Sequence, residues 1–440
     1  MSSELPADVL AMLGVLRRRP DVETPELVAV DAADRLVLAE ARTLLASAGP
    51  GEVAVLDDAY GALALGALAL GAPDVRVATD TVTSERALGL NAALVDDALG
   101  APATDRLRVL PALDPAAVAG ARVVLARLPR SLDALAELAD LVADHAAADV
   151  VLLATGRLKH MSRGMNDVLA VRFGEVSATL ARGKARALVA RGPVPAPEGQ
   201  VRFPRRDRVE VPGAGGDGTL EIVAHGAAFA GPTLDIGTRA LLDVLDELVA
   251  GVGARIGASI DGPSRPSADG RLVAGSAVGS DARPRSGSGS GLGPAPSVVD
   301  LGCGTGVLAT VVARRLPGAR VVATDRSTAA VLSAAATAAA NGVGARVRTL
   351  LDDAGGAVPD GSVDVVVCNP PFHAGAVVST DIAEAMFRAA ARVLRPGGEL
   401  WVVWNSHLRY RPTLARVVGP TTQVSRTPKF TVTRSVRRGA

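Results

Sequence analysis

The chain has 440 residues, a formal net charge of +1, 48% hydrophobic residues and 21% charged residues. This composition is typical of a globular protein of roughly two or three domains, and it excludes a chain that is mainly disordered. The longest uncharged run of low polarity, residues 59–73, is too short and too weakly apolar to span a bilayer. The first residues have no basic patch before an apolar block. We therefore expect a cytoplasmic protein with no membrane segment and no secretory signal.

Two cysteines, Cys303 and Cys368, stand far apart in the chain. They can form neither a disulfide framework nor the closely spaced ligand pairs that are typical of a metal site. The sequence therefore predicts no structural metal.

Basic residues gather in two parts of the chain. Residues 154–210 hold 12 Arg or Lys against five Asp or Glu, a net charge of +7. From residue 401 to the end there are no acidic residues and eight basic ones, Arg409, Arg411, Arg416, Arg426, Lys429, Arg434, Arg437 and Arg438. Such clusters favour a polyanionic partner such as nucleic acid, because each neutralised phosphate releases counterions. A solvated surface with no partner is the alternative.

Residues 261–296 are the clearest break in composition, because more than half of them are Gly, Ser or Pro. Such a segment buries little apolar surface, so we expect a disordered coil. Leucines at helical spacing in residues 238–249 predict a helix before it, and residues 297–301 predict a buried strand after it. The insert is therefore expected to interrupt a domain rather than to separate two.

From residue 297 onward, strand and helix patterns alternate. Strands are predicted at 298–301, 320–324, 345–351, 363–368 and 399–404, and helices at 306–316, 327–340 and 380–394. Elements that alternate in this way predict a parallel, doubly wound sheet. Two β-segments on either side of Thr427-Pro428 predict an antiparallel hairpin at residues 421–435.

The chain contains an internal repeat. One constant shift aligns Val77-Ala-Thr-Asp80 with Val322-Ala-Thr-Asp325, and it also aligns Gly61 with Gly306. The spacing from the glycine to the aspartate is therefore the same in both copies. Duplication explains this match best, so we predict an α/β protein with two tandem lobes. The expected domains are residues 1–195 and residues 196–440, the second interrupted by 261–296.

Asp300-Leu-Gly-Cys-Gly-Thr-Gly306 lies between a predicted strand and a predicted helix. The glycines Gly302, Gly304 and Gly306 allow a sharp turn and let a ligand approach the backbone and the helix N-terminus. A dinucleotide-binding loop places its third glycine one position later, where this chain has Val307. The spacing therefore disfavours a nicotinamide cofactor.

Two acidic positions follow the next strands. Asp325 ends the strand that comes after the glycine loop, where a carboxylate can accept hydrogen bonds from both hydroxyls of a ribose. A helix N-cap is the alternative role. The pair Asp352-Asp353 follows the third strand and could place a carboxylate beside an adenine amine, for which we favour Asp353. An ordinary acidic loop is equally compatible with that pair.

Cys368-Asn-Pro-Pro-Phe-His373 follows the apolar strand at 363–367. The two prolines fix the backbone and remove two amide donors, which leaves the side-chain oxygen of Asn369 and the carbonyl of Pro370 as acceptors. An amine bound to both acceptors turns its lone pair away from them, towards a methyl donor on the glycine loop. Phe372 offers a face on which a planar base can stack.

At these residues the chain resembles the class I S-adenosylmethionine-dependent methyltransferases, and more narrowly the two-lobed bacterial ribosomal RNA guanine-N2 methyltransferases. The narrower match is good over the second half of the chain, from about Gly226 to the end, and holds only in outline over the first lobe. It rests on Phe229 and the segments 234–242, 369–375, 396–400, 407–410 and 429–430. The insert at 261–296 is a departure from the family pattern, and we assign it no role.

The resemblance implies two Rossmann-like lobes and methylation of the exocyclic N2 amine of a guanine in ribosomal RNA. It implies S-adenosylmethionine bound by Asp300, Gly302, Gly304, Gly306, Asp325 and Asp353. It places the base on Asn369, Pro370, Pro371 and Phe372. Asn369 cannot remove a proton, so we expect it to orient and polarise the amine. For His373 we expect a supporting or stacking role.

The first lobe is expected to have lost the chemistry. The repeat aligns Asp57, Asp58 and Ala59 with Gly302, Cys303 and Gly304. A separate alignment of the apolar strand 121–125 with 363–367 places Arg127, Pro129 and Arg130 opposite Asn369, Pro371 and Phe372. We therefore expect this lobe to hold RNA, through Arg157, Lys159, Arg163, Arg182, Lys184, Arg186, Arg205 and Arg206. Basic residues that only solubilise the lobe are the alternative.

Two other functions fit the sequence. The same chemistry could act on an adenine N6 amine or on a glutamine side-chain amide of a protein. Alternatively, the chain could be an RNA-binding ribosome-assembly protein with a vestigial cofactor site. The sequence leaves the oligomeric state open, and we favour a monomer.

Overall fold

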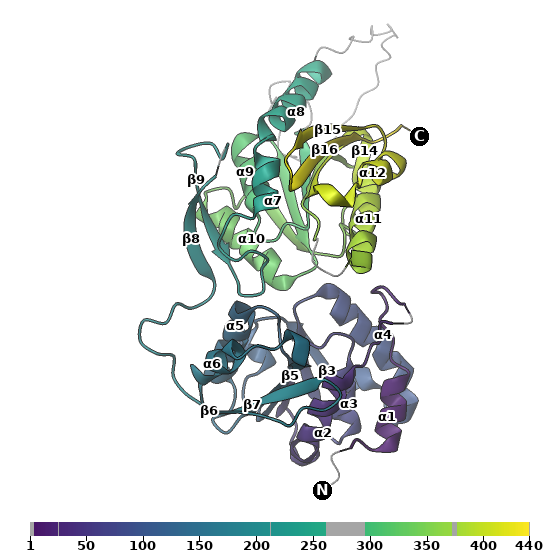
Figure 1. Cartoon of the computed structure of the whole chain (residues 1–440), viewed down its shortest axis with the longest axis vertical. Helices are drawn as coiled ribbons and strands as arrows, with labels where there is room; N and C mark the ends of the chain where they lie inside the picture. Colours follow the sequence, from purple (N-terminus) through teal and green to yellow (C-terminus); the bar gives the residue numbers. More distant parts are fainter. Residues whose placement is uncertain (1–3, 25, 212, 261–294, 372–375, 440) are drawn as a thin grey trace, which may run out of the picture.

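The computed structural model describes residues 4–24, 26–211, 213–260, 295–371 and 376–439. The described chain forms two lobes, which lie one above the other in Figure 1. Each lobe contains a seven-stranded sheet, and a ribbon of β8 (Arg205–Glu210) and β9 (Thr219–Ala224) lies beside the upper lobe. Within these residue ranges, no helix is long and apolar enough to cross a membrane.

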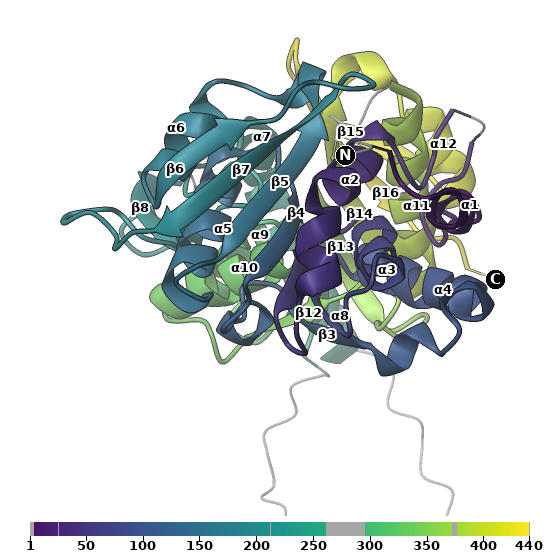
Figure 2. The ribbon, with the colours of Figure 1, turned by 90° about the horizontal axis from the view of Figure 1, so that it is seen from below.

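The sheet of the first lobe has the strand order β3-β2-β1-β4-β5-β7-β6. The strands from β3 to β5 run parallel, whereas β7 is antiparallel to β5 and to β6. Figure 2 shows β4, β5, β7 and β6 side by side. The strands are β1 (Val53–Leu56), β2 (Val75–Thr79), β3 (Leu107–Pro111), β4 (Val123–Arg127), β5 (Val151–Arg157), β6 (Phe173–Ala178) and β7 (Ala185–Pro193).

The sheet of the second lobe repeats this order as β12-β11-β10-β13-β14-β16-β15. Its strands are β10 (Ser297–Leu301), β11 (Arg320–Asp325), β12 (Val347–Leu351), β13 (Val363–Cys368), β14 (Leu394–Asn405), β15 (Thr421–Arg426) and β16 (Phe430–Val436). The predicted hairpin is confirmed, because β15 and β16 pair antiparallel. The equal order of the two sheets confirms the duplication and the doubly wound fold.

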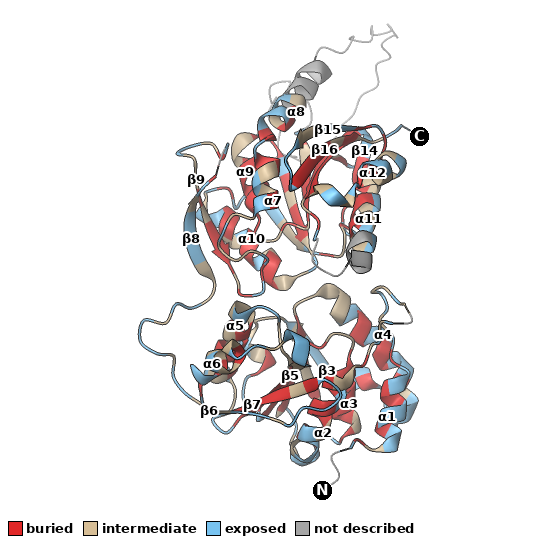
Figure 3. Cartoon of the chain, in the orientation of Figure 1, coloured by how far each residue is buried: buried red, intermediate tan, exposed pale blue. Residues whose placement is uncertain are grey.

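Helices cover both faces of each sheet, so the central strands are buried on both sides (Figure 3). The first lobe has α1 (Ala7–Gly14), α2 (Ala32–Ser47), α3 (Ala62–Ala69), α4 (Val82–Leu99), α5 (Leu132–His145) and α6 (Gly164–Ala170). The second lobe has α7 (Ile236–Leu242), α8 (Leu245–Ile260), α9 (Val307–Arg315), α10 (Thr328–Ala340), α11 (Ala376–Val393) and α12 (Arg411–Val417). The cores contain mainly Val, Leu and Ala, which suits an α/β protein with so few aromatic residues.

Segments on both sides of the insert contribute to one apolar core. Leu241 and Leu248 lie before the insert, yet they pack in one apolar core with Val298 of β10, which lies after it. The single helix predicted at 238–249 is wrong, because α7 ends at Leu242 and α8 begins at Leu245. Most of the insert, residues 261–294, lies outside the described residues, so its predicted disorder stays a prediction.

The lobes meet at equivalent turns, each of which follows the second strand of its sheet. Asp80 of the first lobe accepts hydrogen bonds from the second lobe, through its carbonyl from the Thr328 amide (2.7 Å) and through Oδ1 from the Ala329 amide (2.9 Å). The next amide of α10, that of Ala330, donates to the Ser327 side chain (3.1 Å). The first turn of α10 is therefore capped partly by the other lobe.

A second contact between the lobes lies beside α5. Glu137 of α5 pairs with the His225 ring (Oε1 to Nδ1, 2.6 Å) and accepts a hydrogen bond from the Gly226 amide (2.7 Å). The two contacts together join α5 and the β2–α4 turn of the first lobe to the second lobe.

Asp80→Ala should lower the free energy of unfolding by about 1 kcal/mol, because it leaves a first-turn amide of α10 without its cap. Chemical denaturation of the full chain measures this loss. The control is Asp105→Ala, since Asp105 is exposed in the same lobe and makes no side-chain hydrogen bond to any described residue. Equal stability of the two variants would show that the contact contributes nothing.

Candidate active site

A cavity of about 750 Å³ opens at the carboxyl ends of β10, β11 and β13. Eight of the residues predicted from the sequence line it, namely Asp300, Gly302, Gly304, Asp325, Asp353, Asn369, Pro370 and Pro371. The first lobe contributes Pro20, Asp21, Val22, Thr83 and Arg130 to the same lining. Phe372 and His373 lie outside the described residues. The cavity is therefore formed mainly by the second lobe and closed on one side by the first.

The three glycines of the loop after β10 differ in what surrounds them. All three have positive φ angles, 77° at Gly302, 51° at Gly304 and 75° at Gly306. A Cβ on Gly304 would meet nothing within 4 Å, so its backbone is open to a ligand. A Cβ on Gly306 would lie 2.6 Å from the Cβ of Ala334. Gly306 does not line the cavity, and its lack of a side chain serves the packing of α9 against α10.

Asp325 ties the glycine loop to the end of β11. Its Oδ2 accepts a hydrogen bond from the Gly304 amide (3.0 Å), and its Oδ1 accepts one from the Ser327 amide (3.0 Å). Burial raises the pKa of this carboxyl, although the two amides oppose the shift. The N-cap of α10 is Ser327, so Asp325 does not take the alternative role of capping that helix.

Asp300 is a buried carboxyl beneath the glycine loop, with 1% of its surface exposed. Its Oδ2 accepts a hydrogen bond from the Ala309 amide (2.9 Å), whereas its Oδ1 has no donor among the residues that the structure describes. Burial raises the pKa of Asp300 to about 7. A positive charge nearby would stabilise the ionised form of the Asp300 carboxyl. This position therefore suits a site for a cationic ligand.

The two neighbouring acids after β12 have different surroundings. Asp352 is buried and accepts a hydrogen bond from the Ala357 amide (2.8 Å), so it holds the loop together. Asp353 is half-buried and has no side-chain hydrogen bond to any described residue. The carboxylate of Asp353 is therefore the one available to a ligand.

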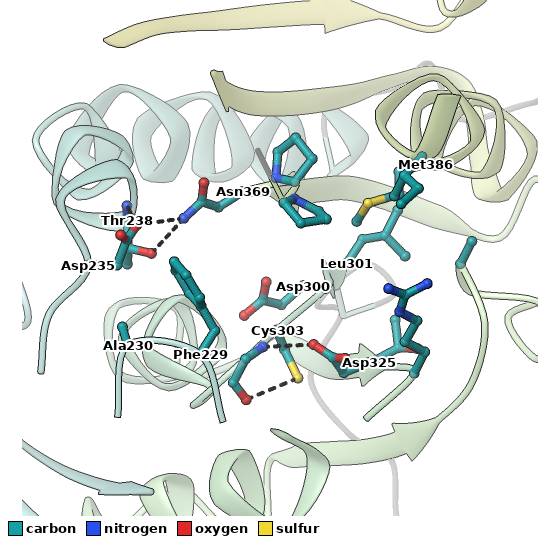
Figure 4. Close-up of a pocket in the computed structure, with 18 of the residues that line it drawn as sticks. Phe229, Ala230, Asp235, Thr238, Asp300, Leu301, Cys303, Asp325, Asn369 and Met386 are labelled. Atoms are coloured by element: carbon teal, nitrogen blue, oxygen red, sulfur yellow. Dashed lines mark hydrogen bonds between the residues drawn. The ribbon is translucent and has the colours of Figure 1, made fainter. Parts of the chain in front are cut away.

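Asn369 follows β13 with its amide group held in one orientation. Its Nδ2 donates to Oδ2 of Asp235 (2.8 Å) and to Oγ1 of Thr238 (3.1 Å), as Figure 4 shows. Because the nitrogen is held by two acceptors, the side-chain oxygen is left as an acceptor for a ligand. Sequence reasoning placed Asp235 and Thr238 in a matched segment but gave them no role.

The corresponding positions of the first lobe carry charged side chains that are engaged within the lobe. Arg127 stands in the place of Asn369 and forms ion pairs with Asp31 and Asp34. The carboxylate of Asp58 accepts hydrogen bonds from three backbone amides at the start of α3. These contacts fill the loop and the strand end with paired charges, which agrees with the predicted loss of chemistry.

The comparisons with known proteins cover both lobes. A family model described as the methyltransferase small domain matches residues 292–434, and one described as the RLMG N-terminal domain matches residues 11–193. A ribosomal RNA large subunit methyltransferase G of Stutzerimonas stutzeri is 35% identical over 96% of this chain and 96% of its own length. The chain belongs to the ribosomal RNA large subunit methyltransferase G family. A member from Pseudomonas aeruginosa is 33% identical over 95% of this chain and 96% of its own length.

A solved structure resembles the present chain over most of its length. It is a 16S rRNA N2 guanine methyltransferase of T. thermophilus in complex with AdoMet and guanosine. The TM-score is 0.63 at 23% identity, and the match covers 91% of this chain and 92% of that one. This likeness confirms the two-lobed methyltransferase fold. No group of three or more metal-ligating side chains occurs in the part of the chain that the structure describes.

Proposed function

We propose that the protein transfers a methyl group from S-adenosylmethionine to the exocyclic N2 amine of a guanine in ribosomal RNA. One observation carries this function. The Asn369 amide is held by Asp235 and Thr238 and lines the cavity. The same cavity is lined by Gly304, whose backbone is accessible, and by Asp325, which we assign to the ribose. An acceptor for an amine and a cradle for a nucleoside cofactor are thus present in one pocket.

The residues present fit S-adenosylmethionine. In this proposal Asp325 accepts hydrogen bonds from the ribose hydroxyls and Asp353 accepts one from the adenine amine, and both residues line the cavity. The open face of Gly304 lets the backbone approach the ligand, and Asp300 contributes negative charge beneath the loop. When bound, the cofactor supplies a methyl group on a sulfonium cation.

Asn369 and Pro370 position the amine of the base. Two acceptors, the Asn369 side-chain oxygen and the Pro370 carbonyl, bind the two hydrogens and so direct the nitrogen lone pair away from themselves. An amide oxygen cannot remove a proton at neutral pH, so the proton leaves to water after transfer. Catalysis in this pocket depends on orientation rather than on a strong base.

Ribosomal RNA is the substrate that the family and the charge distribution support. The relatives are named for the large ribosomal subunit, and the tail is rich in basic residues, which suits a polyanion. Two of these residues, Arg416 and Arg434, form ion pairs with Glu384 and Glu399 and are not counted as RNA contacts. We propose that the enzyme acts in the cytoplasm as a monomer. An adenine amine and a protein glutamine remain the alternative acceptors. The vestigial-site alternative is disfavoured, because the acceptors and the glycine loop are intact.

Mass spectrometry of ribosomal RNA from cells with and without the gene tests the function. We expect one N2-methylguanine to disappear when the gene is removed. Loss of a methyladenine, or of a methylglutamine in a ribosomal or translation protein, would instead support the alternative acceptor. Ribosomal RNA with unchanged modifications would contradict the assignment.

Asn369→Ala should lower turnover on the order of 100-fold, because one of the two groups that orient the amine is lost. Its affinity for S-adenosylmethionine should stay close to that of the wild type. Asp325→Ala should show the opposite pattern, with cofactor affinity lowered by about 10-fold or more. Calorimetry and single-turnover methyl transfer measure the two effects. Asn166→Ala, in α6 and outside the cavity, is the control.

The affinity for S-adenosylmethionine should rise with pH through about 7, because burial raises the pKa of Asp300 to about 7. Below that pH the carboxyl is neutral, and above it the negative charge stabilises the cationic ligand. Asp300→Asn should bind the cofactor with much less dependence on pH in the neutral range. The comparison of the two calorimetric pH profiles is decisive, and equal slopes would remove Asp300 from this role.

We propose that the first lobe holds RNA through a basic cluster of Arg130, Arg157, Lys159 and His160. Arg157 is the last residue of β5, and Lys159 and His160 follow it. Arg130 follows β4, the neighbouring strand. Desolvation and the positive charges of Arg130, Lys159 and Arg157 lower the pKa of the His160 imidazole. The three cations are therefore close to one another around His160 and present one positively charged surface, in which the His160 ring is neutral at neutral pH.

The basic cluster is available to a polyanion. Arg130, Arg157 and Lys159 are exposed, and none has an acidic partner in the described parts of the chain. Arg130 also lines the cavity, so the cluster begins at the entrance of the proposed active site. By contrast, Arg205 and Arg206 form ion pairs with Asp133 and Glu221. The expected role of these two arginines in RNA binding is therefore withdrawn.

Replacement of Arg130, Arg157 and Lys159 by Ala should weaken RNA binding and make its salt dependence shallower. The slope of log affinity against log salt should fall by roughly 2, at about 0.7 to 0.9 for each phosphate contact that is lost. Filter binding to ribosomal RNA at several salt concentrations measures the slope. The matched control replaces Arg42, Arg108 and Arg191, which are exposed in the same lobe and form no ion pair with any described residue. An equal effect of both triple variants would contradict a localised site.

A further inference from the structure

Asp235 has one carboxylate oxygen engaged and one free. Its Oδ2 accepts hydrogen bonds from the Thr238 amide (3.0 Å) and from Asn369 Nδ2 (2.8 Å). Its Oδ1 receives no hydrogen bond from any residue in the described ranges, and the residue is half-buried in the lining of the cavity. Oδ1 of Asp235 therefore has no hydrogen-bond donor among the described residues, and it lies beside Asn369, the residue proposed to position the amine.

The close approach of Asp235 and Asn369 depends on Gly237. A Cβ at this buried glycine would lie 3.0 Å from Oδ1 of Asn369 and 3.0 Å from Oδ2 of Asp235. A side chain here would be tight against both polar groups, which would have to shift by a few tenths of an ångström. The chain therefore keeps the acceptors of Asp235 and Asn369 close together at one wall of the cavity (Figure 4).

The inactive lobe provides an internal comparison. Asp31 caps α2 as Asp235 caps α7, and Arg127 occupies the place of Asn369. All four carboxylate oxygens of Asp31 and Asp34 are engaged by backbone amides or by Arg127. In the first lobe both oxygens of Asp31 therefore accept hydrogen bonds. In the second lobe only one oxygen of the equivalent Asp235 does so among the described residues.

We propose that Asp235 selects guanine by accepting a hydrogen bond from the ring N1–H. Guanine presents this N–H directly beside its N2 amine, whereas adenine presents an unprotonated ring nitrogen beside its N6 amine. The free oxygen of Asp235 therefore attracts the N1–H of guanine and repels the unprotonated N1 of adenine. A glutamine amide offers no second donor at this place. Asp235 also fixes the orientation of Asn369, so it acts on the choice of base and on the position of the amine.

This inference rests on the proposed function and adds the recognition of the base. Guanosine and 2-aminopurine riboside are suitable probes, because both carry the N2 amine and only guanosine has the N1–H. Their binding is measured by fluorescence competition on the full-length enzyme loaded with S-adenosylhomocysteine. The wild type should prefer guanosine by about 10-fold or more, and Asp235→Asn should reduce this preference on the order of 10- to 100-fold.

The matched control is Asp243→Asn, since Asp243 is exposed at the other end of α7 and does not line the cavity. It should keep the wild-type preference. An Asp235→Asn variant that folds and keeps the full preference for guanosine would overturn the inference. Equal binding of the two nucleosides to the wild type, or no binding of guanosine at millimolar concentration, would overturn it without any variant.

The two hypotheses fail differently. Loss of a methyladenine or a methylglutamine in cells without the gene contradicts the proposed function, whatever Asp235 does. Loss of an N2-methylguanine together with an unchanged preference in Asp235→Asn contradicts only the role of Asp235.

Discussion

The hydrogen bond from the Asn369 amide to the Asp235 carboxylate, 2.8 Å long, joins residues that are distant in the sequence. It connects the end of a central strand of the second sheet to the first turn of α7. An asparagine side chain can rotate by half a turn and exchange its oxygen for its nitrogen, so its direction depends on its partners. With the nitrogen held, the cavity receives an acceptor, and the whole interpretation of the site as one for an amine follows from that orientation.

The sequence allowed most of the second lobe to be predicted, because its strands are short apolar runs bounded by Gly, Pro or Asn. The boundaries failed where a turn distorts a regular element. β14 begins at Leu394 rather than at 399, and its pairing with β13 shifts register between Val363 and Val365. Gly397 has a positive φ of 77° in this region, and Gly398 lies against the backbone of β13. Hydrophobic periodicity carries no signal for such an irregularity.

The site was predicted in part for a related reason. The glycine loop and the Asn-Pro-Pro motif are local patterns, and the structure brings them together. The role of Asp235 could not be predicted, because an aspartate before a helix is a common N-cap and its partner is distant in sequence. Gly306 was placed on the cofactor, whereas the structure packs it against Ala334. Three glycines of one loop look alike in sequence, and only their neighbours distinguish packing from ligand approach.

Duplication left two copies of one framework that diverged at equivalent positions. Asp80 and Asp325 end equivalent strands, yet Asp325 holds the glycine loop and Asp80 caps α10 of the other lobe. The same position of the framework thus holds a loop within the second lobe and forms part of the contact between the lobes from the first. The first lobe cannot be removed without exposing the amides at the start of α10, which directly follow Asp325, the residue that holds the glycine loop.

The connection from α8 to β10 enters the second sheet at the amino end of its strands. The cavity opens at the opposite, carboxyl end, roughly the length of one short strand away, on the order of 16 Å. The point at which the described chain resumes before β10 is therefore remote from the pocket. A fluorophore or an affinity handle attached at Ala295, which is exposed just before β10, would therefore lie about a strand length from the pocket.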